Sequence, residues 1–150
     1  MDCAFGGDNY TALTIIQICK DEKGNDKYYA FGYVWQQHVQ KCYGFIKEYC
    51  RRFKVDIIYL EDNADKGYVS QEMDMHGMWT KTYHEQQKKE VKISTYLYAA
   101  WSDMYWHPET DPDYLIQITD YIAGFEPDDA PDSCASLLRE IMTTSQAWIM

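Results

Sequence analysis

Acidic side chains at three well-separated places in the sequence are of the type that binds divalent cations. Asp2 stands near the start, Glu61 follows the apolar run VDIIYL, and four carboxylates crowd into FEPDDAPDS near the end. This last stretch contains Asp128, Asp129 and Asp132 and leads into CASLLREIM, whose apolar residues recur at helical spacing. Carboxylate oxygens are the ligands that Mg²⁺ and Mn²⁺ prefer. The first function to consider is therefore a metal site.

Each of these acids also has an ordinary explanation. Asp2 is compatible with a frayed terminus, and Glu61 with the first solvated residue after a strand. One acid of the last stretch is compatible with a helix N-cap, which stabilises a helix by about 1 kcal/mol. Helix capping accounts for one acid but not for several carboxylates close together. Two carboxylates about 5 Å apart repel each other by roughly 3 kcal/mol at an effective dielectric near 20. Three carboxylates in one place would need cations or raised pKa values.

The elements that would position these acids follow from the hydropathy pattern. Apolar and β-branched residues predict strands over 11–19 and 28–35, joined as a hairpin. Apolar residues three and four apart predict an amphipathic helix across 36–53. The nearly continuous apolar run 55–61 predicts a buried strand, parallel to its neighbour because a helix precedes it.

The second half of the chain predicts further helices and short strands. The predicted segments are a loop and helix ending at Gly77, a strand within 78–85, a helix over 89–102, an extended piece over 103–107 and a last helix over 131–148. A short helix is predicted with Asp111 as N-cap, Pro112 at its first position and Gly124 at its end. The order of the predicted strands and helices along the chain predicts an α/β fold with a mixed central sheet flanked by helices.

In such sheets ligand sites gather at the carboxyl ends of strands. Asp2 is predicted to close a first strand that is only partly present, and Glu61 closes the strand over 55–61. If these strands are neighbours, the two carboxylates meet, and the last helix can bring its N-terminal acids to the same place. The position of Asp2 also predicts that residues 1–150 are a single domain excised from a longer protein.

The composition argues against several classes of function. The 150 residues carry a formal net charge of −10, and no apolar run approaches the roughly 18 residues that a membrane span needs. Residues 93–150 hold one basic and ten acidic residues, so tight binding to nucleic acid by this chain alone is not expected. The five cysteines form no CxxC pair, and His38, Cys42 and Cys50 match no standard zinc spacing, so reduced thiols are predicted.

Four segments, in order, resemble the C-terminal nuclease domain of the large terminase subunit of tailed bacteriophages. They are DCAFGGDNYTALTII, IIYLEDNADKGYV, KKEVKIS and EPDDAPDSCASL. The first family motif is matched by Asp2, Gly6, Gly7 and Asp8, the second by Glu61, Asn63 and Gly67, and the third by Asp128, Asp129, Ala130 and Asp132. The resemblance covers nearly the whole chain, and the ordered set is more specific than any single motif.

The resemblance implies a ribonuclease H-like fold and a metal-dependent endonuclease that cuts concatemeric viral DNA during genome packaging. Two Mg²⁺ or Mn²⁺ ions would lie about 3.5–4 Å apart. Asp2 would bind both ions, Glu61 one of them and Asp129 the other, with Asp128 and Asp132 as further candidates for metal contact or helix capping.

The expected partners follow from the same resemblance. Double-stranded DNA would contact a basic group consisting of Lys81, Lys88, Lys89 and Lys92, although solvated helix faces explain such lysines equally well. No GxxxxGK[ST] occurs, so an ATPase domain of the same polypeptide, the portal and the small terminase subunit would supply most of the affinity. The setting would be the bacterial host cytoplasm. The alternatives are another ribonuclease H-like nuclease, of the resolvase or transposase type, and a non-catalytic interaction module.

Overall fold

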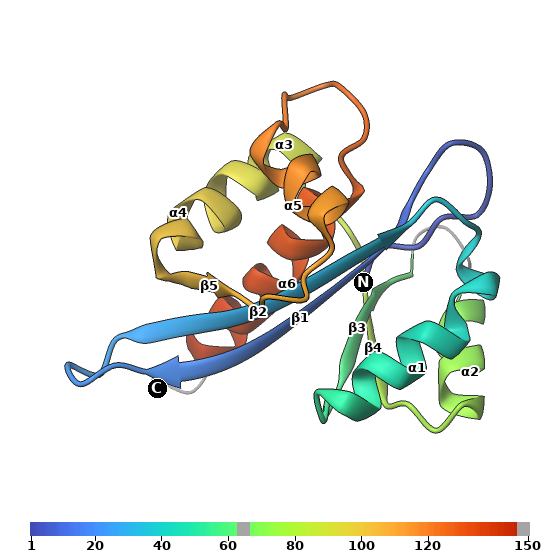
Figure 1. Cartoon of the computed structure of the whole chain (residues 1–150), viewed down its shortest axis with the longest axis horizontal. Helices are drawn as coiled ribbons and strands as arrows, with labels where there is room; N and C mark the ends of the chain where they lie inside the picture. Colours follow the sequence, from blue (N-terminus) through green and yellow to red (C-terminus); the bar gives the residue numbers. More distant parts are fainter. Residues whose placement is uncertain (63–66, 147–150) are drawn as a thin grey trace.

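The computed structural model describes residues 1–62 and 67–146, and it opens with a long antiparallel hairpin. Strands β1 (Thr11–Lys20) and β2 (Asp26–Trp35) pair from Thr11↔Trp35 to Lys20↔Asp26. They form the hairpin predicted for 11–19 and 28–35. A short strand, β5 (Met104–Trp106), lies parallel to β2 on its other edge (Figure 1). The first sheet therefore has the order β1-β2-β5.

A second, smaller sheet consists of β3 (Ile58–Glu61) and β4 (Thr80–Tyr83), which run parallel. The first residues of the chain lie between the two sheets. Asp2 exchanges two backbone hydrogen bonds of 2.9 Å with Ala12 at the start of β1, and the Met1 nitrogen donates to the Tyr59 carbonyl of β3 over 2.9 Å. Asp2 was predicted to end a strand, and in the described residues it forms an isolated bridge outside the named strands.

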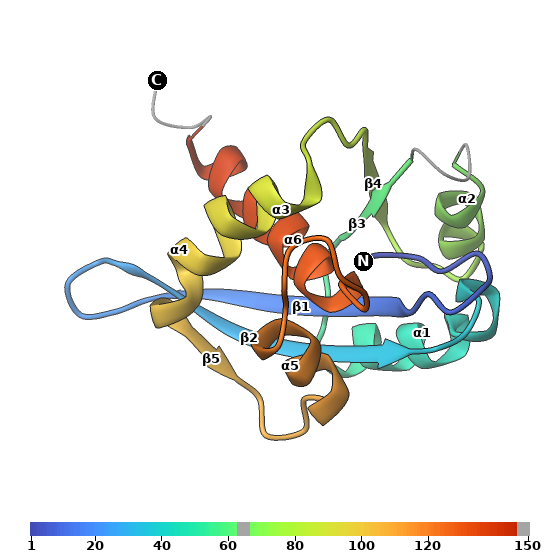
Figure 2. The same cartoon turned by 90° about the horizontal axis from the view of Figure 1, so that it is seen from above.

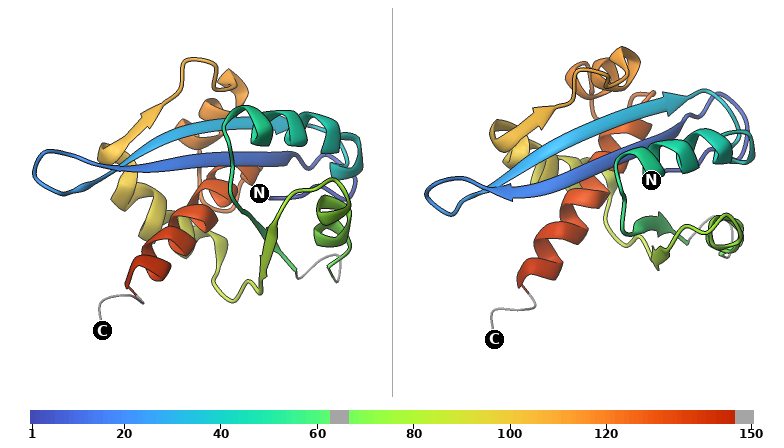
Figure 3. Two further views of the ribbon diagram at one scale, coloured as in Figure 1. Left: turned by 90° about the horizontal axis from the view of Figure 1, so that it is seen from below. Right: turned by 60° about the horizontal axis from the view of Figure 1, so that its bottom comes forward.

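Helices cover the strands in two groups (Figures 1 and 3). The 3₁₀ turn η1 (Val39–Lys41), α1 (Tyr43–Arg52) and α2 (Tyr68–Met75) accompany β3 and β4. They share a core with Leu13 of β1, filled by Ile46, Leu60 and Met73. The other core lies between the hairpin and the later helices, and it includes Leu97 and Leu138.

The later helices differ in detail from the predictions. The predicted helix over 89–102 is one continuous helical stretch of α3 (Lys89–Lys92), η2 (Ile93–Leu97), α4 (Tyr98–Ala100) and η3 (Trp101–Asp103). Helix α5 (Pro112–Thr119) has the predicted Asp111 N-cap, whose side chain accepts from the Asp113 amide. Its predicted end at Gly124 is wrong, because the helix stops at Asp120 and Gly124 lies in a later turn with φ of 84°.

Three further boundaries differ. The helix predicted over 36–53 is α1 from Tyr43 to Arg52, preceded by the separate 3₁₀ turn η1. Helix α6 (Asp129–Gln146) begins two residues before the predicted start, so that Asp129 itself is helical. Strand β3 begins at Ile58 rather than at Val55, because Lys54 adopts a left-handed conformation with φ of 52° and the Val55 amide still bonds to the Cys50 carbonyl of α1.

The chain is a mixed α/β protein with small sheets and flanking helices, as expected from the order of its elements. Figure 2 shows α6 crossing β1, with its first turn near the N-terminus. Within the described residues, no helix combines the length and apolar character needed to cross a membrane.

Candidate metal centre

Asp2 is held at the junction of the two sheets. Its backbone pairs with Ala12, while the preceding Met1 is bonded to β3. The side chain is partly buried. This junction is where the strand pattern predicted the first acid of a metal site.

Asp129 is brought to the same end of β1 by helix α6. Its Oδ2 atom accepts a hydrogen bond of 3.1 Å from the Tyr10 amide, one residue before β1. The amide of Ala130, which has no partner within the helix, donates to Gln117 Oε1 of α5 over 3.0 Å. Gln117 therefore satisfies an amide that Asp128 or Asp132 was expected to cap.

The other two acids of this stretch face lysines. Asp128 Oδ1 lies 2.7 Å from Lys89 Nζ, and Asp132 Oδ1 lies 2.7 Å from Lys92 Nζ. Lys89 Nζ is also 3.9 Å from Asp132 Oδ2, so one ammonium lies between two carboxylates. All three aspartates of the stretch are at least nine-tenths buried. Pro131 follows in the first turn of α6, as predicted.

Lys92 belongs to a buried ion network that the sequence pattern did not reveal. Its side chain is 1% exposed, and Nζ lies 2.7 Å from Glu85 as well as from Asp132. Arg139 of α6 donates to the same Glu85 carboxylate over 2.8 Å. Burial alone would raise the pKa of Glu85, but the hydrogen bonds from Arg139 and Lys92 hold that pKa at about 2. The network ties the segment before α3 to α6 directly beside Asp132.

Glu61 ends β3 beside Tyr83, and in the described residues its carboxylate is related to Asp2 and Asp132 only through this tyrosine. Glu61 and Tyr83 are register partners in the β3–β4 pair. Burial raises the pKa of Tyr83 far above its usual range, against a hydrogen bond with Ser136 of α6, and the carboxylates of Glu61, Asp2 and Asp132 raise it further. Tyr83 therefore lies among acids from three segments, and only the strand register, which sequence patterns do not give, could have revealed it.

Burial, and to a lesser extent the neighbouring acids, raise two pKa values. Burial, and then the negative charges of Asp132 and Asp129, raise the pKa of Asp2 to about 7. Burial raises the pKa of Asp129 to about 6, although the Tyr10 amide and Lys89 act in the opposite direction. These are the raised values that converging carboxylates were expected to have in the absence of a cation.

The donor set fits a hard divalent cation. Ligand oxygens of Glu126, Asp128 and Asp129 all lie within 4.8 Å of one another. Glu126 was not expected among the ligands, and its position within the acidic stretch was the only signal for it. Carboxylate oxygens and no thiol form this group, as Mg²⁺ or Mn²⁺ would require. Exposed acids such as Glu126 also cluster without binding ions, so the two buried members, Asp128 and Asp129, are the stronger indication.

The predicted DNA contacts divide into two classes. Lys81 and Lys88 are exposed, and Lys89 is partly buried against Asp128. Lys92 is enclosed by its carboxylate partners, so it is not accessible to a phosphate at the surface.

The remaining motif residues form turns. Gly6 and Gly7 have φ of 142° and 72° in the exposed turn that ends near Asp8, and Gly67 has φ of 85° at the start of α2. Such positive φ values favour glycine. Asn63 of the second motif lies outside the described residues.

Comparison with protein-family models, with curated protein sequences and with solved structures gave no match.

Proposed function

We propose that this domain is a divalent-metal-dependent endodeoxyribonuclease with a ribonuclease H-like fold. The observation that carries the proposal is the approach of two acids from distant segments, Asp2 and Asp129, at the start of β1. Asp2 is held there by Ala12, and Asp129 by the Tyr10 amide. Glu61 is linked to the group through Tyr83.

In this proposal Asp2, Glu61 and Asp129 would hold two Mg²⁺ or Mn²⁺ ions. Asp128, Asp132 and Glu126 complete the negative environment. Bound ions would supply the positive charge that activates a water and stabilises the oxygen leaving a phosphodiester. The protein contributes rigidity, because α6 and the strand pairs hold the acids in place before any ligand binds.

The proposed substrate is concatemeric viral DNA that is cut during packaging of a phage genome. The ordered resemblance of three motifs to the terminase large subunit supports this choice over a resolvase or a transposase. An ATPase domain in the same polypeptide, the portal and the small terminase subunit are the proposed partners, in a bacterial host cytoplasm. Lys81 and Lys88 are the exposed candidates for phosphate contact.

The net charge of −10 predicts that the isolated domain binds duplex DNA weakly. A filter-binding titration at low salt measures this directly. Nanomolar affinity for duplex DNA would contradict the dependence on other packaging components.

Plasmid cleavage in Mn²⁺ tests the catalytic assignment. Wild type should nick and linearise supercoiled plasmid, and Asp129→Asn should lose at least 100-fold in rate. Asparagine keeps an oxygen that can accept from the Tyr10 amide, so the variant should remain folded. Asp113→Asn, an exposed aspartate in the first turn of α5, is the matched control and should cleave like wild type.

Two results would overturn the proposal. Equal cleavage by wild type and Asp129→Asn would show that Asp129 is not a catalytic metal ligand. Absence of cleavage by a wild-type domain that binds Mn²⁺ and is joined to its ATPase domain would favour the non-catalytic interaction module.

A further inference from the structure

One row of side chains on the first sheet forms an open aromatic surface. Gln17 of β1 is the register partner of Tyr29 of β2, and Tyr29 is the register partner of Tyr105 of β5. Register partners direct their side chains to the same face of a sheet, so the three lie side by side. The two tyrosine rings are stacked, with centroids 5.4 Å apart and 25° between their planes. Their side chains stay half exposed, at 52% for Tyr29 and 49% for Tyr105.

Helix α1 covers the rest of this face. Phe31 and Tyr33, the next two residues of β2 on the same face, contact Tyr49 of α1, with ring centroids 4.8 Å and 5.6 Å away. Phe53, directly after the helix, lies 4.7 Å from Phe31. Because the helix ends there, the row that contains Tyr29 remains open to a ligand.

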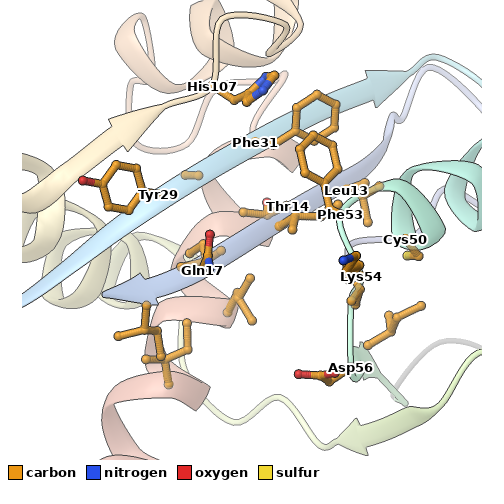
Figure 4. Close-up of a pocket in the computed structure, with 18 of the residues that line it drawn as sticks. Leu13, Thr14, Gln17, Tyr29, Phe31, Cys50, Phe53, Lys54, Asp56 and His107 are labelled. Atoms are coloured by element: carbon orange, nitrogen blue, oxygen red, sulfur yellow. The ribbon is translucent and has the colours of Figure 1, made fainter. Parts of the chain in front are cut away.

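The open row is part of the wall of a cavity of about 890 Å³ (Figure 4). The wall across from β1 is the segment that leads from α1 into β3. Small-molecule sites of about 300–1,000 Å³ combine apolar and aromatic walls with a few polar groups. The polar side chains that line this cavity include those of Gln17, Lys54, Asp56 and His107.

Lys54 occupies a position at which glycine is the usual residue. It follows α1 in a left-handed conformation with φ of 52°, which a Cβ atom makes unfavourable. Its two basic neighbours at the helix end are already paired, Arg51 with Glu48 and Arg52 with Glu109. Within residues 1–62 and 67–146, Lys54 forms no such ion pair. The chain therefore places an unpaired ammonium at the cavity at a cost in backbone free energy.

We propose that this cavity binds a nucleotide, with the base stacked on the Tyr29–Tyr105 pair and the phosphate bound by Lys54. Aromatic side chains stack on every base, because each base has a π-face. The amide of Gln17 offers both a donor and an acceptor to the edge of the base. A purely apolar ligand would leave the lysine charge uncompensated. Asp56 lines the same wall, so a single phosphate is favoured over a di- or triphosphate.

The nucleotide site is distinct from the candidate metal centre. Gln17 lies five residues along β1 from Ala12, the partner of Asp2, which corresponds to about 17 Å at 3.4 Å per residue. The inference does not require the domain to be a nuclease. The ligand is either a free nucleotide or one unpaired nucleotide of a single strand, because both supply the same base and phosphate.

Isothermal titration calorimetry with dAMP tests the aromatic contact. Tyr29→Leu and Tyr105→Leu should each weaken dAMP binding about tenfold, because stacking on an aromatic side chain is lost. Both tyrosines are half exposed, so the variants should remain folded. Tyr98→Leu, at a tyrosine of α4 that is 55% exposed and does not line the cavity, is the matched control and should bind like wild type.

Lys54→Gly separates a binding role of this lysine from a structural one. The substitution relieves the left-handed conformation, so it should keep or raise the melting temperature, yet it should weaken dAMP binding about tenfold. Deoxyadenosine, which has no phosphate, should bind wild type and Lys54→Gly equally. Unchanged dAMP affinity in Lys54→Gly would overturn the assignment of the phosphate contact.

A titration with the single-stranded oligonucleotide (dA)₆ distinguishes the two sources of the nucleotide. Tighter binding of (dA)₆ than of dAMP would support a single strand, and equal binding would support a free nucleotide. Failure of both to bind wild type at millimolar concentration would overturn the proposal. So would binding of an apolar dye that Tyr29→Leu abolishes while dAMP does not displace it, because the face would then be an apolar contact surface.

Discussion

Tyr10 and Asp129 are 119 residues apart in the chain, and the Tyr10 amide donates a 3.1 Å hydrogen bond to Asp129 Oδ2. The bond places the first turn of α6 at the end of β1 that also pairs with Asp2. The Tyr10 amide thus orients the Asp129 carboxylate and holds the start of α6 close to Asp2. Burial at this junction, and then the nearby carboxylates, raise the pKa values of Asp2 and Asp129.

The first prediction concerns stability against pH in metal-free protein. The folded-state pKa values of Asp2 and Asp129, about 7 and about 6, exceed their ordinary value of 3.8. The folded state therefore binds more protons than the unfolded state between about pH 4 and pH 7. The stability contributed by these groups is complete below pH 3.8 and is lost as the pH rises through 7.

Urea denaturation in EDTA should show this loss, on the order of 3 kcal/mol, between pH 5 and pH 8. Asp2→Asn should reduce the change of unfolding free energy with pH, because the asparagine side chain does not titrate. Mn²⁺ should restore the stability of wild type at pH 8 and have a smaller effect on Asp2→Asn. Identical pH curves for the two proteins would show that Asp2 is not the titrating group.

A second prediction concerns Lys92, whose side chain is 1% exposed between Glu85 and Asp132. Lys92→Met removes the cation and leaves two largely buried carboxylates, so it should destabilise the fold by about 3–5 kcal/mol. Chemical denaturation measures the effect. The matched substitution Lys88→Met, at an exposed lysine four residues earlier, should change stability by no more than about 0.5 kcal/mol.

The elements of the fold were largely predictable, because hydrophobic periodicity within each segment determines whether it is a helix or a strand. The hairpin, and the approximate positions of α1 and β3, were predicted in this way. Strand register and the packing of α6 could not be predicted, since they depend on contacts between distant segments.

Those long-range contacts account for what sequence patterns did not reveal. Tyr83 enters the acidic group only because β4 pairs with β3 in one register. Lys92 was expected in a basic group that contacts DNA or forms a solvated helix face. Its burial depends on Glu85, seven residues earlier, and Asp132, forty residues later. A Gly124 helix stop was a sound local inference, but exposed Ile122 and Phe125 show that this segment has no core to pack against.

A third prediction concerns Gly32 of β2. A Cβ atom at this position would lie 2.3 Å from Cε1 of Tyr114, a fully buried ring whose hydroxyl is hydrogen-bonded to Thr14. Gly32→Ala should therefore destabilise the fold by about 1–3 kcal/mol through overpacking. Gly44→Ala is the matched control, because a Cβ atom at this position of α1 would have open space within 4 Å. Alanine there should raise stability by about 0.5–1 kcal/mol, measured by thermal denaturation.

The last prediction concerns Lys89, whose ammonium lies 2.7 Å from Asp128 and 3.9 Å from Asp132. This positive charge already neutralises part of the acidic group, and it repels a divalent cation bound to Asp128 or Asp129. Lys89→Met should therefore increase Mn²⁺ affinity about tenfold at pH 8, where Asp2 and Asp129 are mainly ionised, as measured by isothermal titration calorimetry. Lys88→Met should leave the affinity unchanged, because Lys88 is exposed. Weaker Mn²⁺ binding by Lys89→Met, with the fold intact, would mean that Lys89 positions the carboxylates for the ion rather than competing with it.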